Sequence, residues 1–347
     1  MAKRSRGEVS PPAHVALFEA TALNARGVKE QLVARSFPTA SLKLYTSRTD
    51  PDSNLTDFGG EAMLVSSPDI DALGEIEIAF LCGTRDEGAK YLGWAERKGF
   101  LAIDLSGASL GDNEVPTINI EVNPEAIPIG SGVVAAPHPI AQFLSTLLAP
   151  LARSFAPLRA SAVVLQPASE RGERGIEELY KQTIGLLNFH EVPNTIFGRQ
   201  LAFNLLPSPV HTGKQGPGGA APPEVEREVG RMLGPDAQVT IEIVMAPVFH
   251  CHSVSLHLEL SGSPARERVI AALRESEGIR LQGAGDPITP AERAGKPGVA
   301  VSGIRPTGRD GGYWLWAVTD DLQSGSALNA VRIAETILAR RIAERTH

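Results

Sequence analysis

The sequence predicts a two-domain α/β protein, with a doubly wound parallel sheet in the first domain and an α+β second domain on a mixed sheet. Three observations lead to this prediction. A chain of 347 residues with 42% hydrophobic residues can bury two separate cores. Short apolar segments alternate with helical patterns through the first third of the chain. Longer segments with strand periodicity follow in the second half.

Strand-helix-strand connections of the kind expected in the first domain build a parallel sheet with right-handed crossovers. The expected strands are residues 14–18, 42–46, 76–82 and 100–105. Residues 25–35 and 87–98 are the expected helices. A further short strand, residues 133–136, leads into a buried amphipathic helix that begins at about Pro139. The apolar side chains of this helix recur at helical spacing: Ile140, Phe143, Leu144, Leu147, Leu148 and Leu151.

The second half has longer strands, which predicts a mixed sheet with helices on one face. Its expected strands are residues 161–166, 239–249 and 253–260, and its expected helices are residues 175–187 and 223–233. Residues 207–223 are rich in Gly and Pro and are predicted to form a mobile loop. The last helix must dock on another element because it has one apolar stripe, made by Ala327, Val331, Ala334, Leu338 and Ile342.

Composition excludes several classes of protein. A net charge of −7 argues against a nucleic-acid-binding surface. Two cysteines, Cys82 and Cys251, cannot form a disulfide framework and fit a reducing compartment, so a cytoplasmic location is expected. No apolar run approaches the roughly 18 residues that span a bilayer, so no membrane association is expected. Residues 1–12 are interpreted as a disordered tail rather than a signal peptide.

Residues 134–143 have the frame of a helix start that bears a nucleophile, but they lack the nucleophile. The positive end of a helix is where a cysteine has its pKa lowered and becomes reactive. Pro139 stands at this position, and proline is structurally favourable there. The sequence therefore predicts a helix start without covalent chemistry.

The turn after the first strand also lacks the residues that a dinucleotide fold needs. Glycines there let backbone N–H groups approach the pyrophosphate at the helix N-terminus. Residues 19–25 contain none. Ala22 and Ala25 would cost about 1 kcal/mol each if the turn still required φ > 0. Glu19 either fills the anion site beside the helix N-terminus or is exposed and points away, and both alternatives predict weak dinucleotide binding.

Five strings stand in sequence order along the chain: residues 34–38 (Ala-Arg-Ser-Phe-Pro), residues 103–108 (Ile-Asp-Leu-Ser-Gly-Ala), Pro116 with residues 121–124 (Glu-Val-Asn-Pro), the helix start at residues 134–143, and residues 320–330 (Asp-Asp-Leu-Gln-Ser-Gly-Ser-Ala-Leu-Asn-Ala). Together they resemble the aspartate-semialdehyde dehydrogenase family. The resemblance covers about residues 13–345. Residues 197–207 and 246–249 look like the Usg-type homologues, which also lack the catalytic cysteine. This chain departs further, because those relatives generally keep the glycine turn.

The resemblance implies a Rossmann-like domain and a dimerisation domain. The implied boundaries are residues 13–134 for the first domain, residues 135–323 for the second, and residues 324–347 for a C-terminal helix that packs back on the first domain. The α+β part is expected to form the interface of a homodimer. A heteromer with a true family dehydrogenase is a further expectation.

The resemblance also assigns functional positions one by one. The nucleophilic cysteine corresponds to Pro139, the substrate-carboxylate arginine to Met245, and the phosphate-contacting arginine to Leu110. Gln166 and His252 are retained and are interpreted as remnants with structural hydrogen bonds, and Glu170 and Arg171 replace small residues of the family. The family's cofactor-binding positions correspond to Thr21, Arg48 and Asn329.

Histidines near the second-domain site raise the alternative of a metal centre. His250 and His252 are expected on one face of a strand, with Cys251 on the other, and the resemblance brings His138 nearby. Three histidines without a carboxylate at a defined spacing are a weak pattern, so no metal is predicted.

These replacements predict a catalytically inactive protein that acts as a dimeric binding or regulatory protein. No cofactor is expected, with weak NADP binding as the alternative. The competing hypothesis is an NADP-dependent oxidoreductase that reduces an aldehyde or semialdehyde in amino-acid biosynthesis without acyl-enzyme chemistry, using His252 and Gln166. Hydride transfer alone does not require a cysteine. It does require the bound nicotinamide cofactor, so the replaced turn argues against this hypothesis.

Overall fold

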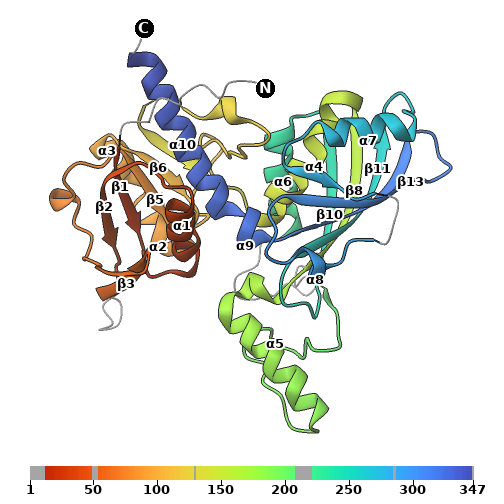
Figure 1. Cartoon of the computed structure of the whole chain (residues 1–347), viewed down its shortest axis with the longest axis horizontal. Helices are drawn as coiled ribbons and strands as arrows, with labels where there is room; N and C mark the ends of the chain where they lie inside the picture. Colours follow the sequence, from red (N-terminus) through yellow and green to blue (C-terminus); the bar gives the residue numbers. More distant parts are fainter. Residues whose placement is uncertain (1–11, 49–53, 129, 208–220, 284–286, 346–347) are drawn as a thin grey trace, which may run out of the picture. The chain divides into compact units, whose positions relative to one another are not determined.

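The computed structural model describes two compact units of the chain (Figure 1). The first unit comprises residues 1–137 and 326–347, and the second comprises residues 138–325. The described residues are 12–48, 54–128, 130–207, 221–283 and 287–345. The predicted N-terminal tail and most of the predicted Gly/Pro-rich loop lie outside them. None of the helices in these described ranges is long and apolar enough to cross a bilayer.

The first unit contains a five-stranded parallel sheet in the order β2-β1-β5-β6-β7, which confirms the predicted doubly wound architecture. Its strands are β1 (Ala13–Phe18), β2 (Thr39–Tyr45), β5 (Ile78–Leu81), β6 (Leu101–Asp104) and β7 (Gly132–Ala135). Its helices are α1 (Leu23–Ala34), α2 (Arg85–Ala89), α3 (Leu92–Lys98) and α10 (Ser326–Arg345), with short 3₁₀ turns η2 (Ile70–Ala72) and η3 (Pro124–Ala126). Every residue of β5 and β6 is buried, as expected for a parallel sheet covered on both faces.

Two features of the first unit differ from the prediction. The expected helix 87–98 starts earlier, at Arg85, because Thr84 and Glu87 form a capping box, and it is divided into α2 and α3 where the chain turns at Tyr91. The Tyr91 ring is buried against Phe18 and Trp94, so the break places an aromatic side chain in the core. A two-stranded hairpin, β3 (Leu55–Phe58) with β4 (Glu61–Leu64), lies outside the main sheet and was not predicted.

Helix α10 packs beside α1 in the first unit (Figure 1). Val331, Ala334 and Leu338 of its apolar stripe are buried in the same core cluster as the strands. Gly27 of α1 allows this approach, because a Cβ atom there would lie 3.0 Å from the Cβ of Ala327. The chain end after the second unit is therefore part of the first unit's core.

The second unit is built on a seven-stranded mixed sheet in the order β12-β13-β14-β11-β8-β10-β9. Strand β8 pairs in parallel with β10 and antiparallel with β11, which confirms the predicted mixed sheet. The strands are β8 (Leu158–Gln166), β9 (Leu206–Pro207), β10 (Ala237–Met245), β11 (His252–Leu260), β12 (Ile279–Leu281), β13 (Val299–Pro306) and β14 (Gly312–Thr319). The predicted strand 239–249 instead ends at Met245, and strands β12 to β14 were not predicted. Pro247 has no N–H to continue the ladder.

Six helices belong to the second unit as described: α4 (Pro139–Phe155), α5 (Gly172–Leu187), α6 (Pro222–Leu233), α7 (Arg266–Arg274), α8 (Pro290–Arg293) and α9 (Asp321–Ser324), together with the 3₁₀ turn η4 (Ala168–Arg171). Helix α4 begins at Pro139 as predicted, and its apolar residues are buried. It packs against α6 and α7. These contacts fix the start of α4 within the second unit.

Helix α5 and the segment after it form an arm that extends away from the sheet (Figure 1). Two buried polar side chains hold this segment to the helix. The carboxylate of Glu178 accepts hydrogen bonds from the backbone N–H groups of Thr195, Ile196 and Phe197. The side-chain oxygen of Gln182 accepts from the N–H groups of Leu201 and Ala202 at 2.7 and 3.0 Å. The string at residues 197–207 is thus tied to α5 by backbone amides.

Candidate functional site

The candidate site of the first unit lies at the carboxyl ends of β1 and β5. Open α/β sheets bind ligands outside the carboxyl ends of their strands, at the point where the strand order reverses. Strand β1 pairs with β2 on one side and with β5 on the other, so the order reverses between β1 and β5. Glu19 follows β1 directly, and Gly83 comes two residues after β5.

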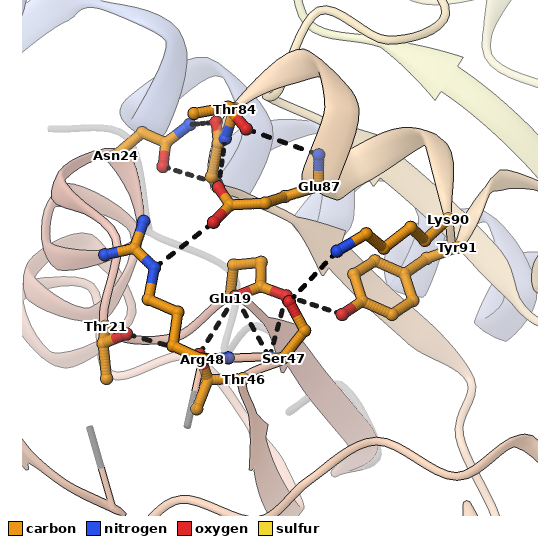
Figure 2. A network of polar contacts seen from close by, with 11 residues as sticks. Glu19, Thr21, Asn24, Thr46, Ser47, Arg48, Thr84, Glu87, Lys90 and Tyr91 are labelled. Atoms are coloured by element: carbon orange, nitrogen blue, oxygen red, sulfur yellow. Dashed lines mark hydrogen bonds and ion pairs between the residues drawn. The ribbon is translucent and has the colours of Figure 1, made fainter. Parts of the chain in front are cut away.

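Glu19 is fully buried at this point, and its carboxylate accepts hydrogen bonds from three groups (Figure 2). The hydroxyl of Thr46 donates to Oε2 at 3.0 Å, and the backbone N–H of Ser47 donates to Oε1 at 3.0 Å. The phenol of Tyr91 donates to Oε1 at 2.6 Å. Burial, followed by the bond to Glu19, raises the pKa of Tyr91, so this phenol remains a donor at neutral pH.

The alternative of an exposed Glu19 is wrong, and so is the assumed place of the backbone strain. The other alternative placed the carboxylate in an anion site beside the start of α1, but its donors come from the residues that follow β2 and from Tyr91. Ala22 has φ −71° as the N-cap of α1, and Ala25 lies inside that helix, so neither carries the expected cost. Glu19 itself has φ +56°, the left-handed conformation that glycine favours. Such a residue costs about 1 kcal/mol or more and needs support from its surroundings.

Asn24 fills the neighbouring part of the same edge. Its side-chain amide donates to the carbonyl oxygens of Gly83 and Leu105, each at 3.2 Å, and accepts from the Gly83 N–H at 2.9 Å. Gly83 has no room for a side chain, because a Cβ atom there would lie 2.6 Å from Oε2 of Glu87 and 3.0 Å from the Cβ of Glu19. The chain's own side chains therefore occupy the carboxyl ends of β1, β5 and β6.

The predicted cofactor-binding residues are distributed over two places in the first unit. Thr21 lies near Glu19, with its hydroxyl 3.5 Å from that of Thr46. Arg48 also lies there, and its Nε donates to Oε1 of Glu87 at 3.3 Å (Figure 2). Asn329 is buried elsewhere, where its side chain donates to the carbonyl of Ile118 and accepts from the N–H of Ile120. Its amide therefore supports a loop of the fold.

Two further side chains complete the polar edge around Ser47. Lys90 donates from Nζ to the Ser47 hydroxyl at 3.4 Å. Glu87 accepts from the backbone N–H of Thr84 at 2.7 Å. Burial opposes ionisation of Glu87, but the bonds from Thr84 and Arg48 outweigh it and lower its pKa. Arg48, Lys90 and Glu87 thus form a charged rim around the buried Glu19 carboxylate.

The candidate site of the second unit lies at the start of α4. His138 is the N-cap residue, and its Nδ1 accepts a hydrogen bond from the N–H of Ile140 at 3.2 Å. The backbone N–H of His138 donates to Oε2 of Glu228 in α6 at 2.7 Å. Pro139 occupies the first helical position, where the sequence predicted it. An imidazole therefore caps this helix end, and the residue that follows has no nucleophilic group.

His138, Glu170 and His252 form a buried cluster beside this helix start. Nε2 of His138 lies 3.2 Å from Oε1 of Glu170, and Nε2 of His252 lies 3.2 Å from its Oε2. Only 9% of the Glu170 side chain and 1% of the His252 side chain are exposed. Because Nδ1 of His138 accepts a bond, a neutral ring carries its proton on Nε2 and donates to Glu170. Burial opposes ionisation of Glu170, but the two imidazoles hold its pKa well below the usual range.

The other predicted positions of the second unit lie at the same sheet edge. Gln166 ends β8 and is paired in register with Met245, the last residue of β10. His252 begins β11, whose next residue, Ser253, pairs with Leu165. Gln166, Met245 and His252 are all buried. Leu110, in the first unit, is partly buried.

Two acidic residues of this site were missed by sequence reasoning. Glu170 was noted only as a replacement of a small residue, and Glu228 was not considered. The available signal for Glu170 was a charged residue four positions after the end of the predicted strand 161–166, in a chain with several histidines. Glu228 gave no signal, because it lies on a helix rich in charged residues.

The alternative of a metal centre required His250 and His252 on one face of a strand, but only His252 belongs to a strand. Strand β11 begins at His252, and Cys251 before it has φ +73°, so His250 and Cys251 lie in the preceding turn. In the described part of the chain, no group of three or more His, Cys, Asp or Glu side chains could hold a metal ion.

Comparison with known proteins gives two family matches. The model described as "Semialdehyde dehydrogenase, NAD binding domain" matches residues 25–129, and the one described as "Semialdehyde dehydrogenase, dimerisation domain" matches residues 148–323. An aspartate-semialdehyde dehydrogenase of Rickettsia bellii is 29% identical, with 94% of this chain and 97% of the relative covered. A USG-1 protein homolog of Azotobacter vinelandii is 30% identical, with 95% and 99% covered.

Solved structures agree with these matches. The crystal structure of aspartate semialdehyde dehydrogenase II complexed with ASA from Vibrio cholerae has a TM-score of 0.84 and 28% identity, and covers 95% of this chain and 99% of its own. A probable aspartate-semialdehyde dehydrogenase from Pseudomonas aeruginosa also has a TM-score of 0.84 and 28% identity, with 94% and 98% covered.

Proposed function

Because this chain belongs to the semialdehyde dehydrogenase family, we propose that it is a non-catalytic member that acts as a dimeric binding or regulatory protein. The observation that carries the proposal is the start of α4, where Pro139 follows an imidazole cap and no thiol is present. Acyl-enzyme chemistry needs an activated nucleophile at such a helix end. In the protease subtilisin, loss of the nucleophile alone lowers kcat by about a million-fold.

Neither cysteine of the chain can replace the missing thiol. Cys82 is fully buried, and burial raises the pKa of its thiol well above the usual range. Cys251 is 1% exposed and lies in the left-handed turn before β11. A reactive cysteine needs an accessible thiolate, so both residues act as small apolar side chains.

The residues at the two positions where the family has substrate-binding arginines support the same proposal. By resemblance to the family, the two arginines that hold anionic substrate groups correspond to Met245 and Leu110. Apolar side chains cannot form the charge-assisted, bidentate hydrogen bonds that carboxylate and phosphate groups receive from arginine. A phosphorylated or carboxylate substrate would therefore lose most of its recognition here.

The residues of the first unit do not fit the nicotinamide dinucleotide that the family implies. The turn after β1 contains no glycine, and the buried carboxylate of Glu19 lies at the strand ends where the dinucleotide would bind. Asn24 bonds the backbone groups of Gly83 and Leu105 at the same edge. The proposed protein therefore works without a resident dinucleotide.

The second unit supplies the proposed assembly. The match to a dimerisation domain covers residues 148–323, and this range contains the mixed sheet and the arm of α5. We therefore propose a homodimer formed through this unit. The same surface offers a route to a heteromer with an active family dehydrogenase.

The test is an assay of the purified full-length chain with aspartate semialdehyde, inorganic phosphate and NADP⁺ or NAD⁺. We expect no reduced cofactor to form. Pro139→Cys is the companion variant, and it should also stay inactive because Met245 and Leu110 cannot hold the substrate. Turnover by the wild-type chain that is abolished in His252→Ala would overturn the proposal in favour of an oxidoreductase that needs no cysteine.

A further inference from the structure

Glu19 combines two unfavourable features at the edge of the first sheet. Its carboxylate is completely buried, and its backbone has the left-handed φ of +56°. Glutamate is rarely buried without partners, and a non-glycine residue keeps a positive φ only when its surroundings demand it. The side chain must therefore accept hydrogen bonds at this position from donors that would have no partner if the residue were glycine, which suits this backbone conformation best.

The groups around Glu19 are those of an oxyanion site. A hydroxyl from Thr46, a backbone N–H from Ser47 and a phenol from Tyr91 all donate to its two oxygens, at 2.6 to 3.0 Å (Figure 2). Hydroxyl and backbone N–H donors also bind phosphate oxygens in proteins. Arg48 and Lys90 lie beside these donors, where they bond to Glu87 and Ser47.

The position of these donors in the fold indicates which kind of phosphate group they would bind. Tyr91 directly precedes α3, and Thr46 and Ser47 directly follow β2, beside the reversal of strand order between β1 and β5. In doubly wound folds this is where the ribose of a bound adenine dinucleotide is recognised, and an arginine nearby accommodates a 2′-phosphate. Arg48 directly follows the donor Ser47, and Lys90 directly precedes the donor Tyr91.

We infer that Glu19 is a built-in occupant of an oxyanion site at the end of β2, and that its carboxylate excludes a phosphate group carried by an adenosine ribose or free in solution. This inference rests on the proposed function, because a member without catalysis has no need to keep the site open. Beyond the proposed function, one side chain, Glu19, is responsible for excluding the ligand, and a phosphate group is the ligand that binds when this side chain is removed.

The experiment compares four full-length proteins: wild type, Glu19→Gly, Glu19→Asn and Glu19→Gln. Glycine and asparagine both accept a left-handed backbone, and both remove the carboxylate from its donors. Glutamine is the matched control, because it keeps the length and one acceptor oxygen of the original side chain. Thermal unfolding of each variant establishes that it is folded before any ligand is added.

Each protein is titrated calorimetrically with adenosine 2′,5′-bisphosphate, adenosine 5′-monophosphate and inorganic phosphate at constant ionic strength. We expect Glu19→Gly and Glu19→Asn to bind the bisphosphate at least tenfold tighter than wild type and Glu19→Gln do. If the variants bind the bisphosphate more tightly than the monophosphate, the site recognises a phosphate group on the ribose. If they bind inorganic phosphate as tightly as the bisphosphate, the site recognises free oxyanions. Adding Arg48→Ala to Glu19→Gly should weaken binding.

Three results would overturn the inference. They are bisphosphate binding by wild type as tight as by Glu19→Gly, no gain in either folded variant, and failure of both variants to fold. The last result would make Glu19 a structural support rather than a replaceable occupant. None of them depends on turnover, so the inference and the proposed absence of catalysis can fail separately.

Discussion

Glu170 holds a buried negative charge between the imidazoles of His138 and His252, so its contribution to stability should depend on pH. Burial opposes its ionisation, but the two imidazoles lower its pKa well below the ordinary value of 4.5. A carboxyl group whose pKa falls on folding stabilises the folded chain above its unfolded pKa. This stabilisation is lost as the pH falls below 4.5 toward the folded pKa.

We therefore expect Glu170→Gln to lower the free energy of unfolding at neutral pH by about 3 kcal/mol, the lower end of the cost of breaking a buried pair. The difference from wild type should shrink as the pH is lowered below the ordinary pKa of glutamate. Urea unfolding of both proteins over a range of pH measures it. A difference that stays constant with pH would contradict the ionised state of Glu170.

Glu228 is the matched control, because it is also buried and also contacts His138 but has the opposite pKa direction. Burial raises the pKa of Glu228, and this outweighs its attraction to His138 and the bond from the His138 N–H. Its ionisation therefore costs stability as the pH rises above 4.5. Glu228→Gln keeps an acceptor for the His138 N–H and should be as stable as wild type, or more stable, at neutral pH.

Helices and strands could be predicted where adjacent residues encode them, whereas the contacts between side chains at the two candidate sites could not. The start of α4 at Pro139 was predicted because a helix start is encoded in adjacent residues. The cluster of His138, Glu170 and His252 was not, because its members come from the N-cap of α4, from η4 and from β11 and meet only after the sheet has formed. The donors to Glu19 were not predicted for the same reason, since Tyr91 is 72 residues away.

Packing of α10 on α1 can be tested at Gly27. In most helices, replacing an interior glycine with alanine stabilises by about 1 kcal/mol. Here the new Cβ would lie 3.0 Å from the Cβ of Ala327, so the helices must separate. Overpacking of this kind costs about 1 to 3 kcal/mol.

We expect Gly27→Ala to be destabilising by about 1 kcal/mol in urea unfolding, against the usual trend. Adding Ala327→Gly removes the opposing methyl group and should make the Gly27→Ala change stabilising. This double-mutant comparison isolates the contact between the two helices. A stabilising single variant would mean that α10 does not pack on α1 as described.

At the scale of the whole molecule, the proposed homodimer predicts where apolar surface must be covered. The range that matches a dimerisation domain contains most of the large exposed hydrophobic side chains of the described residues. Tyr180, Ile184 and Leu187 share one face of α5 by their helical spacing, and Phe189 follows at 97% exposure. An exposed apolar stripe of this kind marks an interaction surface.

Light scattering coupled to size-exclusion chromatography should therefore give twice the chain mass for the wild-type protein. Ile184→Asp and Leu187→Asp should shift the mass toward the monomer at the same protein concentration, because each buries an unpaired charge in the interface. Leu64→Asp is the control, since Leu64 is 71% exposed on β4 of the first unit and lies outside the matched domain. It should leave the mass unchanged. A monomeric wild-type protein would refute the proposed dimer, and a dimer resistant to both α5 variants would move its interface away from the arm.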